Sequence, residues 1–187
     1  MSVMALKAAE YRPRYRRYTS PAQLRRFEML DGVLCMISVP DTRHQAVALR
    51  MASALLERVE AGNLGLVLQA PYSVMLSGNT VVQPDILYVR KERRGMVGRM
   101  NLHGAPDLVI EVISEGTRLR DLSLKRKIYA RFEIPEYWIV DPEAEKVELL
   151  IWSEWGYATA GVLGKSGRLS SPMLPLGIPL SGIFKTG

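Results

Sequence analysis

The chain has 187 residues, 48% of them hydrophobic and 24% charged, with a formal net charge of +6. This balance is typical of a globular protein, and a single cysteine together with two histidines excludes an internal disulfide and a zinc site of ordinary ligand spacing. The longest uncharged stretch is broken by Asn, Gln, Gly, Ser and Pro, so no membrane span is predicted. The N-terminus lacks the pattern of a secretory signal, and we expect a cytoplasmic protein.

Positive charge is concentrated at the N-terminus. Residues 1–26 hold seven basic residues and one acidic residue, whereas the remainder is neutral. Arg14, Arg16 and Arg17 lie among tyrosines, so this arm could contact phosphates and stack on bases. A solvated, disordered tail would have the same composition. We expect a basic arm over 1–22 and one domain over 23–187.

The first element predicted after the arm is a β-hairpin over 26–37. Its turn is Asp31-Gly32, a pair suited to positive φ. Glu28 lies between two apolar residues of the first strand, so it points to the opposite face from them. That face could be solvent or a site, and from the residues alone Glu28 is interpreted as exposed.

A helix is predicted over 43–61, with Asp41 or Thr42 as its N-cap and Gly62 at its end. Apolar residues recur every four positions at Val47, Met51, Leu55 and Val59. His44 lies in the first turn, where it could reach a phosphate or cap the helix; capping is the favoured interpretation.

The middle of the chain predicts strands over 64–69, 73–76 and 81–89, a mobile loop over 90–104 and a strand over 107–113. The last of these is almost wholly apolar, which indicates burial on both faces within a sheet flanked by helices.

A second helix is predicted over 118–132, with Lys125 inside its apolar arc and Arg120 pointing the other way. Strands over 137–140 and 147–152 follow, and the chain from Gly164 onward looks irregular.

Two acidic residues lie inside apolar strands, Asp85 and Glu111, and Lys125 follows on the helix. Unpaired carboxylates are costly to bury, whereas Mg²⁺ and Mn²⁺ prefer such oxygen ligands, to which the carbonyl of Val112 could be added. A metal site is one interpretation. The other is a salt bridge between a strand carboxylate and the helix lysine, with Asp85 simply at a strand start and Asp121 pairing with Lys125.

The runs VVQPDILYV, GAPDLVIEVIS, TRLRDLSLKRKIYA and IPEYWIVDPEAEKVELL resemble the bacterial Uma-two family of restriction-endonuclease-like proteins over about residues 24 to 152. The resemblance implies an α/β (α+β) fold of the PD-(D/E)xK nuclease-like superfamily, with a central mixed β-sheet flanked by helices. It places family site positions on Asp85, Glu111, Lys125, Glu28 and His44. The superfamily's lysine two residues after the glutamate is Ile113 here, which is common in this family.

The leading hypothesis is a Mg²⁺- or Mn²⁺-dependent endonuclease acting on nucleic acid, with DNA as the expected substrate. Asp85 and Glu111 would be metal ligands with Val112, Lys125 would assist the attacking water, and Glu28 would be an auxiliary ligand. Contacts to nucleic acid are expected at His44, Arg118, Arg14, Arg16 and Arg17. The alternative is an inactive nucleic-acid-binding or interaction module with the same fold. A homodimer is expected, because a small nuclease that cuts both strands commonly has two subunits.

Overall fold

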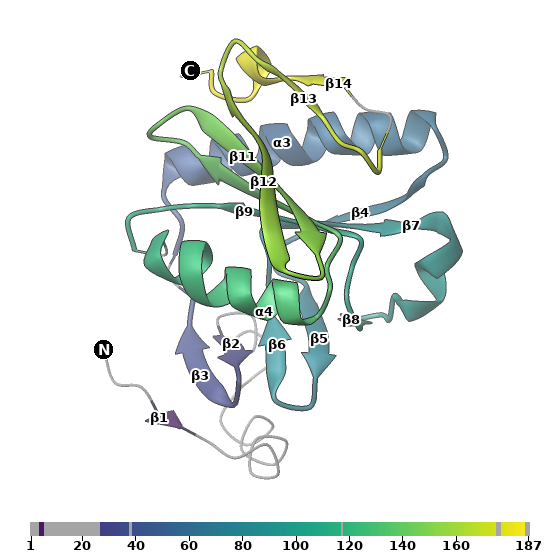
Figure 1. Ribbon diagram of the computed structural model, residues 1–187, viewed down its shortest axis with the longest axis vertical. Helices are drawn as coiled ribbons and strands as arrows, with labels where there is room; N and C mark the ends of the chain where they lie inside the picture. Colours follow the sequence, from purple (N-terminus) through teal and green to yellow (C-terminus); the bar gives the residue numbers. More distant parts are fainter. Residues whose placement is uncertain (1–3, 6–26, 38, 117, 175–176, 186–187) are drawn as a thin grey trace.

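The computed structural model describes residues 4–5, 27–37, 39–116, 118–174 and 177–185. Within these residues the strands form two six-stranded sheets, called A and B here, and one two-stranded sheet. Figure 1 shows sheet B in the middle, helix α3 on one side of it, and helix α4 with sheet A on the other. No helix in the described part of the chain is long and apolar enough to cross a membrane.

Sheet B is the central mixed sheet. Its strands, in spatial order, are β12 (Gly156–Gly164), β11 (Lys146–Ser153), β10 (Glu136–Asp141), β9 (Leu108–Val112), β7 (Ile86–Arg90) and β4 (Gly65–Gln69). Strands β9 and β10 run parallel, and the other neighbours are antiparallel. The predicted mixed sheet flanked by helices is confirmed.

Sheet A contains the predicted hairpin. Its order is β1 (Met4–Ala5), β3 (Val33–Met36), β2 (Phe27–Leu30), β6 (Thr80–Val82), β5 (Ser73–Ser77) and β8 (Asn101–His103). The turn between β2 and β3 has positive φ at both Asp31 and Gly32, as the sequence predicts.

Helix α3 (Thr42–Ala61) begins and ends where the sequence predicts. The Asp41 side chain accepts a hydrogen bond of 2.8 Å from the backbone N–H of His44, which makes Asp41 the N-cap, and Gly62 follows the last turn. The apolar stripe of α3 is buried against one face of sheet B.

Strand β9 divides the core into two layers. Ile110 and Val112 pack with α3, whereas Val109 packs with α4 and sheet A. By alternation Glu111 shares the side of Val109. A carboxylate is thereby placed between sheet B and the elements of the second layer.

The second helix contains a π-helical turn near its start. Residues 118–131 are helical, and within them η2 (Arg120–Lys125) is a π-turn that continues into α4 (Arg126–Arg131). A π-turn closes i→i+5 hydrogen bonds, so it aligns residues five apart, and such turns are frequent at functional sites. The expected helix is present, but its π-turn changes which side chains share a face.

The predicted strand over 81–89 is wrong, because two strands of different sheets occupy it. Strand β6 belongs to sheet A and β7 to sheet B, and the chain crosses between them at 83–85. Pro84 lies in this crossing and has no N–H to donate to a ladder. The crossing ends at Asp85, directly before β7.

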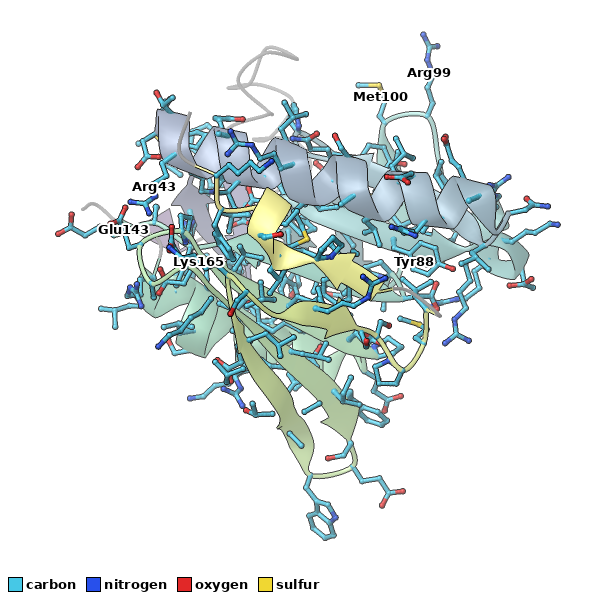
Figure 2. All side chains as sticks on the ribbon, turned by 90° about the horizontal axis from the view of Figure 1, so that it is seen from above. Arg43, Tyr88, Arg99, Met100, Glu143 and Lys165 are labelled. Atoms are coloured by element: carbon cyan, nitrogen blue, oxygen red, sulfur yellow. The ribbon has the colours of Figure 1, made fainter. Side chains whose placement is uncertain are left out.

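The segment over 90–104 is more regular than the predicted loop. It contains the 3₁₀ helix η1 (Lys91–Met96) and β8, which pairs with β5, and Arg99 and Met100 project from the turn between them (Figure 2). Buried Asp107 anchors the segment through an ion pair of 2.7 Å with Arg93.

The chain after Gly164 is also more regular than expected, and β12 before it was not predicted. Strands β13 (Arg168–Ser170) and β14 (Gly177–Pro179) pair, the 3₁₀ helix η3 (Leu180–Gly182) follows, and apolar residues from this region join the core beneath α3.

Glu136 holds this C-terminal segment against sheet B. Its Oε1 accepts hydrogen bonds from the Ser171 hydroxyl at 2.7 Å and the Met173 N–H at 3.0 Å, and its Oε2 accepts one from Trp138 Nε1 at 2.9 Å. A glutamine turns an NH₂ group toward one of these donors. Glu136→Gln should therefore lower the free energy of unfolding by about 1–3 kcal/mol in urea titrations. An unchanged urea midpoint and slope would contradict this.

Candidate active site

A cavity of about 240 Å³ opens where β7 begins, β9 ends and the N-terminus of α3 approaches sheet A. Its lining includes side chains from β2, α3, β9 and the π-turn. The titratable ones are Glu28, His44, Asp85, Glu111, Arg120, Asp121 and Lys125. All four catalytic residues predicted from the sequence are among them.

Asp85 stands directly before β7, and its side chain is fixed at the cavity. Its Oδ2 accepts a hydrogen bond of 2.8 Å from the backbone N–H of Val112 and lies 3.3 Å from His44 Nε2. The side chain is 22% exposed, so the carboxylate remains accessible from the cavity.

Glu111 is buried between the sheets and lines the cavity. Its Oε1 accepts hydrogen bonds from Lys125 Nζ at 2.9 Å and from the Tyr129 hydroxyl at 2.5 Å. Burial raises the pKa of Glu111 well above its usual range, and the neighbouring carboxylates of Asp121 and Asp85 add to the rise, against the opposing charge of Lys125. Sequence reasoning missed Tyr129, although it lies four residues after Lys125 and so on the same helix face.

Lys125 is the centre of the site. Its Nζ lies 2.9 Å from Glu28 Oε1, 2.9 Å from Glu111 Oε1 and 3.5 Å from Asp121 Oδ1. Burial lowers the pKa of Lys125, but the three carboxylates outweigh it and leave the pKa well above its usual value. The pairing of Asp121 with Lys125 is confirmed, and the lysine is a charged ammonium at neutral pH.

Glu28 is 1% exposed, so the interpretation of it as an exposed strand residue is wrong. Its Oε1 accepts a hydrogen bond of 2.9 Å from the Gln83 N–H, which ties β2 to the crossing between the sheets. Both faces of β2 are covered: Met29 packs in a small cluster of its own, and Glu28 faces the cavity. Two-residue alternation cannot distinguish a second buried face from solvent.

Arg120 lines the cavity together with Lys125, so the prediction that it points away from Lys125 is wrong. On an ordinary α-helix, residues five apart are separated by roughly 140°. The π-turn aligns them instead. Arg120 Nε lies 3.9 Å from Glu28 Oε2 and 3.8 Å from Asp121 Oδ1.

His44 does not cap α3, so the favoured interpretation of it is wrong. Asp41 is the cap, and the imidazole points to Asp85. Burial lowers the pKa of His44, but the hydrogen bond and charge of Asp85 outweigh this and raise the pKa. Contact of His44 with nucleic acid stays a prediction.

Two arginines outside the cavity lining form ion pairs with carboxylates. Arg118 Nη2 lies 2.6 Å from Asp141 Oδ2, and Arg43 pairs with Glu143 at 3.1 Å, where Figure 2 shows the two side chains together at one end of α3. Any contact of Arg118 with nucleic acid must therefore compete with Asp141. The three arm residues predicted to contact nucleic acid lie outside the described residues: Arg14, Arg16 and Arg17.

The donor set fits a divalent cation held jointly with substrate. Among the described residues no group of three or more His, Cys, Asp or Glu side chains could hold an ion alone. Mg²⁺, however, is usually held by one or two carboxylates, with waters and substrate phosphates completing its shell. The described lining has four carboxylates against the two permanent cations Lys125 and Arg120, and Glu28 Oε2 is buried without a hydrogen bond there. This surplus of negative charge suits a cation.

A central mixed sheet that presents Asp85 and Glu111 at its strand ends, beside a helix lysine, defines a restriction-endonuclease-like protein. The chain belongs to the Uma2 (Uma-two) family: the family model, described as "Putative restriction endonuclease", matches residues 12–181.

A solved structure supports the fold independently. The crystal structure of "a putative nuclease belonging to DUF820 from Anabaena variabilis ATCC 29413" is similar to this chain with a TM-score of 0.70 at 16% identity. The similarity covers 84% of this chain and 89% of that one. At this identity the likeness shows the fold alone. No curated protein matches the chain.

Proposed function

We propose that the protein is a Mg²⁺- or Mn²⁺-dependent endonuclease that hydrolyses phosphodiester bonds of nucleic acid, with DNA as its substrate. The observation that carries the proposal is the cluster of buried carboxylates around Lys125 in an open cavity. Burying such charge costs several kcal/mol per ion unless it is well paired. Hydrolysis of a phosphodiester, which needs a bound metal ion, is a reason for this chain to retain buried charge.

The cavity as it stands would repel a phosphodiester, since carboxylates outnumber cations among its described lining residues. Asp85 and Glu111, with the carbonyl of Val112, are the groups that would hold the metal. When bound, the ion would polarise the phosphate and lower the pKa of a water. Binding of nucleic acid at this site should therefore need a divalent cation.

The chain's own residues then have distinct tasks. Lys125 would orient the attacking water or stabilise the developing charge on the phosphate. Glu28 and Asp121 hold the ammonium in place from two sides. In hydrolysis, the water oxygen bonds to phosphorus while the bond from phosphorus to the leaving oxygen breaks.

A module without turnover is the second candidate. It is favoured by the ion pair of 2.9 Å between Lys125 and Glu111, which such a module predicts. A module of this kind would bind nucleic acid with strong salt sensitivity and no need for Mg²⁺.

The proposal is tested with Asp85→Asn, which keeps an acceptor for the Val112 N–H but removes the charge. Mn²⁺ and Mg²⁺ are titrated calorimetrically into both proteins, which are then incubated with supercoiled and single-stranded DNA. We expect saturable binding and cleavage in the wild type, with the cleavage rate of the variant lower by about 100- to 1,000-fold. Wild-type protein that binds DNA in EDTA and never cleaves it would support the binding module instead.

We also propose a homodimer, since two sites are needed to cut both strands of a duplex together. Strand β12 forms an edge of sheet B and carries no charged residue, and such an edge can pair with another strand. Sedimentation that shows only monomer at micromolar concentration would exclude this.

A further inference from the structure

Arg120 is a half-buried arginine that lines the cavity. Its side chain is 20% exposed, and its Nε is buried without a hydrogen-bond partner in the described part of the chain. A guanidinium carries five N–H donors. Among the described residues, its one hydrogen bond runs from Nη1 to the Met36 carbonyl at 3.5 Å, the outer limit for such a bond.

Some arginines of the protein hold a carboxylate closely, whereas Arg126 stays 4.0 Å from Glu148. Arg93 reaches Asp107 at 2.7 Å and Arg118 reaches Asp141 at 2.6 Å, both at hydrogen-bond distance. Arg120 stays 3.8 Å or more from each of its carboxylates. It contributes positive charge to the cluster, yet its donors are not committed to the cluster's oxygens.

The backbone directs this side chain toward the cavity. Arg120 and Lys125 are the first and last residues of the π-turn, and both line the cavity. A regular α-helix would place them on different faces. The π-turn therefore presents two cations to the cavity. Lys125 is surrounded by carboxylates, whereas Arg120 has N–H donors that bind no carboxylate closely.

We propose that Arg120 binds the non-bridging oxygens of the substrate's phosphate. A guanidinium matches a phosphate with two parallel N–H···O bonds, a geometry that lysine cannot reproduce. The inference rests on the proposed function for the identity of the substrate, and it adds a phosphate-binding residue that the sequence analysis placed on the wrong face.

The test compares Arg120→Lys and Arg120→Gln with Lys127→Gln, an exposed residue on the same helix. Arg120→Lys keeps the charge of the cluster and so keeps the fold even where the glutamine variant unfolds. The probes are inorganic phosphate, measured calorimetrically with Mn²⁺ present, and a labelled DNA duplex, measured by fluorescence anisotropy in Ca²⁺.

We expect Arg120→Lys to weaken binding of both probes by about tenfold or more. Arg120→Gln should also reduce the salt dependence of duplex binding by about one unit of slope, whereas Lys127→Gln should leave phosphate binding unchanged.

The outcomes separate the two proposals. If wild type cleaves DNA and Arg120→Lys binds and cleaves equally well, the role of Arg120 is overturned and the nuclease stands. If wild type binds both probes through Arg120 but never cleaves, the nuclease is overturned and the phosphate site stands. If wild type binds neither probe, both are overturned.

Discussion

Lys125→Met should lower the free energy of unfolding by about 3–5 kcal/mol, because it leaves buried carboxylates without their counter-ion. Three carboxylates contact the ammonium, and both Glu28 and Glu111 are almost fully buried. Methionine matches the lysine side chain as far as Cε and lacks only the ammonium group, so lost packing contributes little. Urea unfolding at pH 7 measures this loss, and in thermal unfolding of a chain of this size the midpoint should fall by roughly 6–20 °C.

The pH dependence shows whether charge causes the loss. Lys125 has a raised pKa in the folded state, so its stabilisation is present below its ordinary value of 10.5 and is lost as pH rises through the folded pKa. In the methionine variant, acid protonates the carboxylates, and the deficit should shrink as pH falls. Lys127→Met is the control on the same helix and should change stability by no more than about 0.5 kcal/mol. A Lys125→Met protein as stable as wild type at pH 7 would mean that the cluster is not ionised.

The central residues of the site were predictable because their charge conflicts with their surroundings. Asp85 and Glu111 interrupt apolar strands, and Lys125 interrupts an apolar arc of its helix. Each conflict marks a place where burial must be compensated. Helix α3 was predictable because periodicity, an N-cap and a terminal glycine agree.

The residues and the strand that were predicted wrongly each depend on a feature that a regular repeat of apolar residues does not reveal. Glu28 looked exposed because a strand pattern does not reveal a second layer over its other face. Arg120 was placed on the wrong face because the pattern assumes 3.6 residues per turn, and a local π-turn breaks that assumption. Strand β12 was missed because its small, half-exposed residues alternate too weakly to predict a strand.

Glu111→Gln should separate function from folding, because it should lose cleavage while becoming more stable. The glutamine carbonyl can still accept from Lys125 and Tyr129, and Lys125 keeps Glu28 and Asp121 as partners. The variant removes a carboxyl group whose charged form is penalised by burial. We expect a gain of about 0.5–2 kcal/mol in the free energy of unfolding at pH 7, the usual exchange between activity and stability. The cleavage rate should fall by about 100- to 1,000-fold.

The sign of the pH effect is also fixed. Because the pKa of Glu111 is raised in the folded state, the stabilisation from its protonated form is present below its ordinary value of 4.5 and is lost as pH rises through the folded pKa. The advantage of Glu111→Gln should therefore be small at pH 4 and grow as pH rises. Glu136→Gln is the matched comparison, since within the described ranges that buried side chain accepts from neutral donors alone and should lose stability. If Glu111→Gln is destabilised like Glu136→Gln, then the Glu111–Lys125 pair serves the fold, and the inactive module becomes the better account of the site.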